Sequence, residues 1–175
     1  YNADLTISSA STLDAAVALG NNINIVNGSV TITQSATMDA TALQSVIDKI
    51  FTVTGNMVYR AGGTTVTPQT FNNLASTGDL TLRVNGPISA TSLVTAGTIT
   101  LETTFTSKVT GVDFSLLSSV TDITTGSTAD SVNFSQATNV DLGSLVVYTD
   151  ALSITTKKDA TLDIAALDDL NASGT

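Results

Sequence analysis

Short stretches of alternating apolar and polar residues recur along the chain. Each begins with Gly or Asp and continues as x-apolar-x-apolar, the pattern of a half-buried β-strand. The copies are GSVTI from Gly28, GNMVY from Gly55, GDLTL from Gly78, GTITL from Gly97, DSVNF from Asp130 and DALSI from Asp150, and ADLTI from Ala3 opens the chain. The pattern predicts seven short strands.

After each strand and a loop comes a second pattern. It consists of an apolar residue, then usually Asp, then further apolar residues. Its copies are LDAAVA from Leu13, MDATAL from Met38, VTPQTF from Val66, ISATSL from Ile88, VDFSLL from Val112, VDLGSL from Val140 and LDIAAL from Leu162. Their starts are 22 to 28 residues apart, a recurrence typical of stacked supersecondary units.

Strands this short cannot close a core alone, so like positions of successive repeats are expected to stack. One predicted buried ladder is Val30, Met57, Leu80, Ile99, Val132 and Leu152, and the other is Met38, Val66, Ile88, Val112, Val140 and Leu162. Helical spacing of apolar residues in ATALQSVIDKI also predicts one short helix within 40–50. We therefore predict a mostly all-β solenoid of about seven irregular parallel coils, forming one domain over residues 1–175.

The combination of Gly-x-Leu-x-Ile with a later apolar-x-x-Leu resembles a known family. It is similar to the leucine-rich-repeat-like coils of receptor-L-type domains and to repeats of bacterial adhesins or filament proteins, particularly those of Bacteroidota. The asparagine-ladder position of those coils has no consistent counterpart in this sequence. The resemblance covers the whole chain and implies an extracellular, right-handed β-solenoid that serves adhesion, scaffolding or recognition.

Composition narrows the function classes. The net charge is −9, and six scattered basic residues offer no stripe that could neutralise a nucleic-acid backbone. No run of eighteen apolar residues predicts a membrane span. The chain has no His and no Cys, which excludes Ser-His and Cys-His catalysis, disulfides and the common transition-metal ligands.

Asp recurs at the second position of the second pattern, as Asp14, Asp39, Asp113, Asp141 and Asp163. Thr67 and Ser89 take the same position in the other two copies, and both residue types also cap turns. We interpret these side chains as turn caps and predict no cofactor. The alternative is a calcium site that uses Asp113, Asp141 and Asp163.

Two further functions compete with a structural one. The outward positions of the strands form a mostly threonine stripe, which favours a carbohydrate- or ice-binding module as the alternative function. The stripe consists of Thr6, Thr31, Val58, Thr81, Thr100, Asn133 and Ser153. A small carbohydrate-active enzyme with paired acids such as Asp168 and Asp169 comes third. With few aromatic residues and no long loops to wall a cleft, the protein is predicted not to be an enzyme.

Glycan acceptor patterns are weak candidates for modification. Asn27, Asn133 and Asn171 each stand in an Asn-x-Ser context, and Ser131 lies in a DSV triplet that resembles the O-glycosylation signal of Bacteroidota. A chain this rich in Asn, Ser and Thr contains such patterns by chance.

Neither end of the predicted stack reads as a polar cap. We therefore expect a structural or adhesive repeat unit of an extracellular filament or cell-surface protein, stacking end to end through uncapped ends. The expected partners are other copies or neighbouring repeats of the same polypeptide, with surface glycans as a further class, and neither nucleic acid nor a membrane span.

Overall fold

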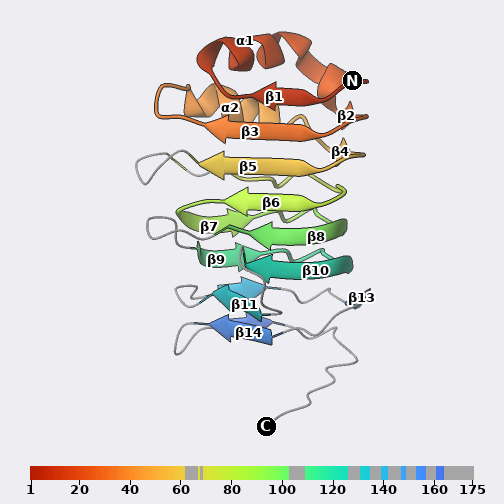
Figure 1. The fold of residues 1–175 in the computed structure, drawn as a ribbon, viewed down its shortest axis with the longest axis vertical. Coiled ribbons are helices and arrows are strands. Elements are labelled where there is room, and N and C mark those ends of the chain that lie inside the picture. Colours follow the sequence, from red (N-terminus) through yellow and green to blue (C-terminus); the bar gives the residue numbers. More distant parts are fainter. Residues whose placement is uncertain are drawn as a thin grey trace.

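The computed structural model describes residues 1–61, 67, 69–102 and 109–125, and beyond them the strands within 131–134, 139–141, 147–148, 153–156 and 161–163. These residues form a stack of short parallel strands that runs from the N-terminus downward in Figure 1.

The largest element is a seven-stranded parallel sheet whose order follows the sequence. Its strands are β1 (Leu5–Ile7), β3 (Val30–Gln34), β5 (Met57–Ala61), β6 (Leu80–Arg83), β8 (Thr95–Leu101), β10 (Ser119–Thr125) and β13 (Val147–Tyr148). Each strand therefore adds to the sheet one repeat after its neighbour.

The register of this sheet aligns like positions of successive repeats. Leu5 pairs with Val30, Val30 with Met57, Met57 with Leu80 and Leu80 with Ile99. The last four of these residues have no exposed side-chain surface. The first predicted ladder is thus confirmed from Val30 to Ile99, and burying each such side chain contributes about 1.5–3 kcal/mol.

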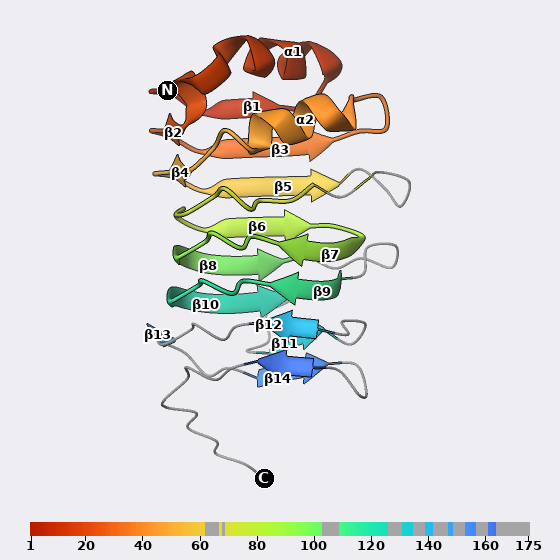
Figure 2. The ribbon, with the colours of Figure 1, turned by 180° about the vertical axis from the view of Figure 1, so that it is seen from behind.

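Helices and then a smaller sheet cover the other side of the stack, as Figure 2 shows from behind. The helices are α1 (Ala10–Leu19) and α2 (Ala40–Ile47), with a 3-10 turn, η1, at Gly20–Ile23. The smaller parallel sheet has the order β15-β12-β9-β7 and consists of β7 (Gly86–Ser89), β9 (Val109–Asp113), β12 (Asn139–Asp141) and β15 (Thr161–Asp163).

Two short pairs complete the described strands. β2 (Ile25–Val26) pairs with β4 (Thr52–Val53), and β11 (Ser131–Phe134) pairs with β14 (Ser153–Thr156).

The register of the second predicted ladder is confirmed over its last four members, of which Ile88 and Val112 are buried. Ile88 pairs with Val112, Val112 with Val140 and Val140 with Leu162. Met38 is buried just before α2, whereas Val66 lies outside the described residues.

The predicted fold class, a mostly all-β right-handed solenoid, is wrong. The described structure is mixed α/β, with a central parallel sheet and two helices packed on it, and these residues form no closed all-β solenoid. In the first two repeats a helix occupies the side where later repeats place a strand. The helix expected within 40–50 is present as α2.

The repeat spacing does not reveal helix α1, because that spacing aligns Leu13, the first buried residue of the helix, with strand positions of other repeats. The local signals are helical. Ser9 is the N-cap, and its hydroxyl accepts a hydrogen bond from the Thr12 N–H at 3.2 Å, while the Thr12 hydroxyl oxygen accepts from the Ser9 N–H at 2.9 Å. This reciprocal capping starts the helix, and Gly20, at φ 57°, ends it.

Strand β10 was also missed, and it changes the later alignment. Ile123 pairs with Ile99, so β10 and not the segment around Val132 continues the large sheet. Val132 pairs instead with Ile154, two residues beyond the predicted Leu152, which lies outside the described residues.

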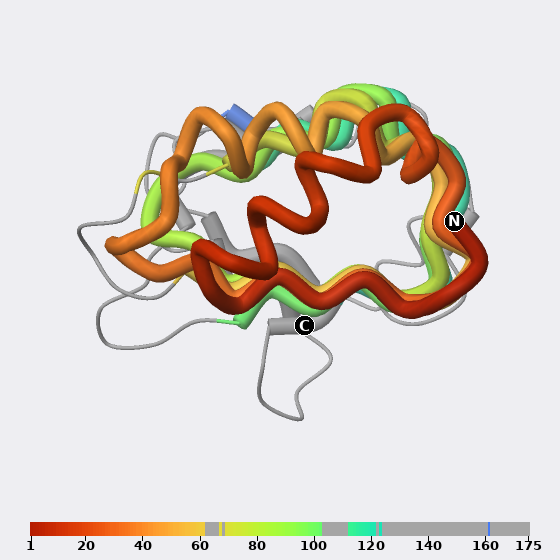
Figure 3. The backbone as a smooth tube through the Cα atoms, turned by 90° about the horizontal axis from the view of Figure 1, so that it is seen from above, coloured from red at the N-terminus to blue at the C-terminus, as the bar shows by residue number. Residues whose placement is uncertain are grey.

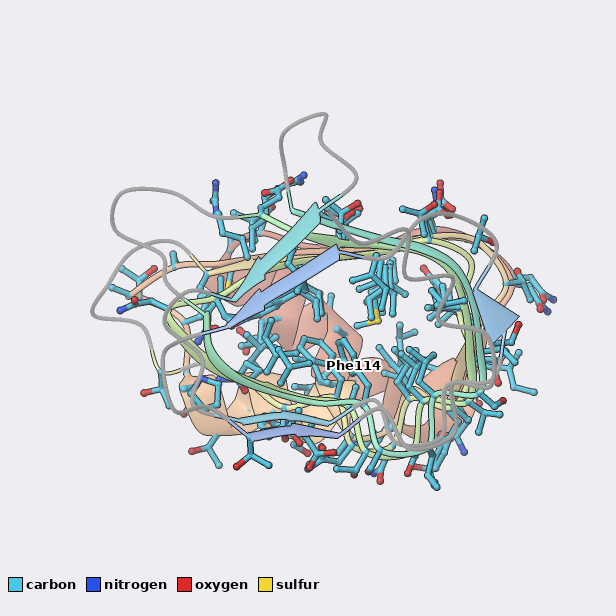
Figure 4. The ribbon with its side chains drawn as sticks, turned by 90° about the horizontal axis from the view of Figure 1, so that it is seen from below. Phe114 is labelled. Atoms are coloured by element: carbon cyan, nitrogen blue, oxygen red, sulfur yellow. The ribbon has the colours of Figure 1, made fainter. Side chains whose placement is uncertain are left out.

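Side chains from both sides of the stack meet in one apolar interior. Phe114, which follows β9, points into this interior in the view from below (Figure 4). Tyr59 and Phe71 meet edge to face there with ring centroids 5.2 Å apart. Aromatic packing of this kind adds about 0.5–1.5 kcal/mol to the burial of the rings.

Glycine is required where four successive repeats approach, at Gly28, Gly55, Gly78 and Gly97. The Gly78 N–H donates to the Gly55 carbonyl at 2.9 Å, and a Cβ at Gly78 would lie 2.7 Å from that same oxygen. Backbone oxygen cannot give way as a flexible side chain does. The repeated Gly therefore fixes how closely the repeats can stack.

We predict that Gly78→Ala lowers the free energy of unfolding by about 1–3 kcal/mol, because the added methyl group must push two rungs apart. Gly20→Ala is the matched control, since nothing lies within 4 Å of its Cβ and only its positive φ is strained. It should cost about 1–3 kcal/mol through backbone strain alone, and so it sets the scale for strain without a steric clash. Urea unfolding of both variants measures this, and a Gly78→Ala protein as stable as wild type would contradict the steric argument.

Candidate functional site

A line of side-chain hydrogen bonds connects the first five repeats, with acceptors that stand just before β1, β3, β5 and β6. Asp4 Oδ1 accepts from the Ser29 N–H at 2.7 Å, and Ser29 Oγ accepts from the Asn56 N–H at 3.2 Å. Asn56 Oδ1 accepts from the Asp79 N–H at 3.0 Å, and Asp79 Oδ1 from the Thr98 N–H at 2.9 Å. We call Asp4, Ser29, Asn56 and Asp79 the acceptor ladder.

The acceptor ladder was not predicted from the sequence. The residue type changes between Asp, Ser and Asn, so a search for one recurring residue does not find it. What recurs is a short side chain with an oxygen acceptor, placed directly before the first buried residue of the strand. Each such bond satisfies a backbone N–H that would otherwise face solvent at the corner.

The outer face of the large sheet carries a column of mostly hydroxyl side chains. Strand register aligns Thr6, Thr31, Val58, Thr81 and Thr100. Neighbouring members are about 4.8 Å apart, the spacing of hydrogen-bonded strands. The predicted threonine stripe is thus confirmed from Thr6 to Thr100 as one aligned column, while Asn133 lies on β11 and Ser153 on β14, outside this sheet.

A charged column runs beside the threonine column on the same face. Arg60 pairs in register with Arg83, and the next strand ends one residue before Glu102. Arg60 reaches past the strand of Arg83 to bind Glu102 with two hydrogen bonds, Nε to Oε2 at 2.8 Å and Nη2 to Oε1 at 2.5 Å. Hydrogen bonding from Arg60 lowers the pKa of Glu102, and the charge of Arg83 adds to this lowering.

The capping interpretation holds for two of the recurrent Asp residues. Asp39 is the N-cap of α2, where its Oδ1 accepts from the N–H groups of Thr41 and Ala42 at 2.8 and 2.9 Å. Asp113 Oδ1 accepts from the Ser115 N–H at 3.2 Å. For Asp14 the interpretation is wrong, because this residue lies exposed inside α1, whose cap is Ser9.

The three acids of the calcium hypothesis stand in register on neighbouring strands. Asp113 pairs with Asp141, and Asp141 with Asp163. Among the described residues no group of three or more acidic, His or Cys side chains is arranged to hold a metal ion. Asp168 and Asp169, the paired acids of the enzyme alternative, lie outside the described residues.

Three of the four glycosylation candidates lie on described residues, and two of these share one strand. Asn27 is exposed, and its Nδ2 donates to Asn2 Oδ1 at 2.7 Å. Asn133 and Ser131 belong to β11, and Asn171 lies outside the described residues.

A buried polar cluster lies at one end of the interior, unrelated to the predicted sites. The Tyr59 hydroxyl donates to Gln34 Oε1, and Gln34 Nε2 donates to the Thr67 carbonyl at 3.3 Å. Gln69 Nε2 donates to the same carbonyl at 3.0 Å. Burial raises the pKa of Tyr59 to about 12, while a hydrogen bond with the Gln69 backbone acts in the opposite direction.

The raised pKa of Tyr59 predicts a loss of stability in alkali. In unfolded chains the Tyr pKa is about 10, so the contribution of the neutral phenol is complete below pH 10 and falls as pH rises toward 12. Up to about 2–3 kcal/mol is lost across this window. Denaturant unfolding between pH 8 and 12 measures it.

Tyr59→Phe is the control for this effect. It is less stable near pH 8, because Gln34 Oε1 loses its buried donor, at a cost of about 1–3 kcal/mol. Its difference from wild type should then shrink above pH 10. A constant difference up to pH 12 would show that Tyr59 does not titrate as argued.

Comparison with known proteins yields no family model, no curated protein and no solved structure that matches this chain. Among the described residues, no helix is both long and apolar enough to span a membrane.

Proposed function

We propose that this chain is a structural or adhesive repeat unit of an extracellular filament or cell-surface protein, joined to neighbouring units at the ends of its stack. The proposal is non-enzymatic. Its main support is the character of α1, which lies at the N-terminal end of the described stack.

Helix α1 crosses over the space enclosed by the chain when the stack is viewed from above (Figure 3). The first rung is therefore covered, unlike the open end expected from the sequence. The inner face of the helix buries Leu13 and Ala16. Such a cap ordinarily has a polar outer face.

The outer face of α1 is instead largely apolar. Ala15, Val17 and Ala18 are exposed, with Val17 42% exposed, and Asp14 is the only charged residue in the helix. Helices that are apolar on all sides are usually buried. This supports packing of a neighbouring unit against α1, in a head-to-tail arrangement that can continue without closing.

The parallel stack suits a role as a repeating unit. Among the described residues, each strand of the large sheet pairs only with the strands of the preceding and following repeats, so length can be added without redesigning the core. The outer face of the large sheet then presents side chains at a fixed spacing along the whole unit. A regular surface of this kind supports adhesion.

We predict that wild-type protein self-associates with increasing concentration and that Val17→Lys prevents it, because a buried charge without a partner is costly at an interface. Sedimentation velocity over a hundredfold concentration range measures the mass. The variant should need at least about a tenfold higher concentration to associate.

Val94→Lys is the matched control, since Val94 is 41% exposed and lies away from α1. Its N–H donates to the Ala75 carbonyl. It should associate as wild type does. A wild-type protein that stays monomeric throughout, or equal effects of both substitutions, would contradict packing through α1.

A carbohydrate- or ice-binding module is the second candidate, favoured by the threonine column. Ice binding needs a flat and uniform array, whereas Arg60, Arg83 and Glu102 occupy the neighbouring column. The observations therefore favour the carbohydrate form of this candidate.

A further inference from the structure

Among the described residues, two of the three basic side chains stand next to each other. The chain carries a net charge of −9, and its described cations other than the N-terminus are Lys49, Arg60 and Arg83. The two arginines stand in register on β5 and β6, on the outer face of the large sheet. Like charges on neighbouring strands repel each other, so their pairing requires compensation.

The compensation is incomplete. Glu102 is the only Glu in the chain, and both of its oxygens bind Arg60. Arg83, on the strand between them, makes no ion pair with a described residue. Its guanidinium, with five N–H donors arranged as a planar fork, is therefore available to a carboxylate from outside.

The surroundings of Arg83 suit a polyhydroxylated ligand. Thr81 stands two residues earlier on the same face of β6, and Thr100 pairs with Thr81 from β8. Val58 pairs with Thr81 from the other side, on β5. Hydroxyl groups hydrogen-bond with sugar hydroxyls, and the Val58 side chain offers an apolar contact to the C–H face of a sugar ring.

We propose that Arg83 anchors a binding subsite for the carboxylate of an acidic polysaccharide, with the sugar units lying along the threonine column. The inference rests on the proposed adhesive function and identifies the class of surface glycan bound. The Arg83 fork pairs with the carboxylate through two parallel N–H···O bonds, and Thr81 is the nearest hydroxyl to the sugar.

A singly charged carboxylate fits this site better than a more highly charged group. Glu102 stands beside Arg83, and the whole chain is acidic, so a dense polyanion would be repelled on approach. Two hydrogen bonds from one guanidinium match the two oxygens of a carboxylate. Specific contact therefore depends on geometry at Arg83 more than on net charge.

The test is calorimetric titration of the full chain with a neutral oligosaccharide that carries a single galacturonic acid unit, and with the neutral methyl ester of the same compound. The titrations use the Val17→Lys variant. Self-association through α1, if the wild-type protein shows it, then does not interfere with the measurement of glycan binding. We expect the acidic oligomer to bind and its neutral form to bind at least about tenfold more weakly, because the ester removes the charge-assisted pair.

Substitutions then locate the site. Arg83→Gln should raise Kd for the acidic oligomer at least about tenfold, and Arg83→Lys, which keeps the charge without the fork, should raise it less. Lys49→Gln removes the same charge away from this face and should leave Kd unchanged. Thermal unfolding verifies that each variant is folded.

The proposal is overturned if the acidic oligomer does not bind the folded wild-type surface, or if Lys49→Gln weakens binding as much as Arg83→Gln. A sulfated dextran of similar length that binds as tightly as the carboxylated oligomer would also overturn it, because attraction by charge alone would then account for the result. None of these outcomes bears on self-association, which the Val17→Lys and Val94→Lys comparison tests separately.

Discussion

The structure depends on the close parallel approach of successive repeats at the glycine corner. The N–H groups of Gly55, Gly78 and Gly97 each donate to the carbonyl of the preceding repeat's glycine, at 2.8–2.9 Å. A side chain at these positions would meet backbone or ladder atoms at 2.5–2.8 Å. The corner therefore sets the distance between repeats, and the acceptor ladder beside it holds the same register with side-chain oxygens.

That register determines what each face of the sheet can do. Because side chains alternate between the two faces of a strand, a slip by one residue would expose the apolar ladder and bury the threonine column. With the register fixed, apolar side chains fill the interior while Thr and Arg residues align outside. The proposed roles of α1 and Arg83 both follow from this separation, since one concerns the end of the stack and the other its outer face.

Much of this arrangement could be predicted from the sequence, because strand alternation has a period of two that local residues reveal. The aligned positions from Val30 to Ile99 and from Ile88 to Leu162 are examples. The fold class could not be predicted in the same way. At Leu13, repeat spacing and helix capping gave conflicting indications, and the capping by Ser9 and Thr12 decided the local structure.

The functional features were harder to predict for two physical reasons. The acceptor ladder uses chemically equivalent oxygens on different residue types, so no single letter recurs. Arg60 lies on β5 and Glu102 directly follows β8, which is not adjacent to β5 in the sheet, so only the stacked structure shows that Arg83 lies between them. The caps at Asp39 and Asp113 were predictable because they act within their own turn.

Amide hydrogen exchange, followed by NMR, tests the glycine corner most directly. If the repeats stack as described, the N–H groups of Gly55, Gly78 and Gly97, together with those of Asn56, Asp79 and Thr98, exchange only through unfolding of the stack, far more slowly than in an unstructured peptide. Exchange of these amides at peptide rates, while the strand interiors stay protected, would contradict the account.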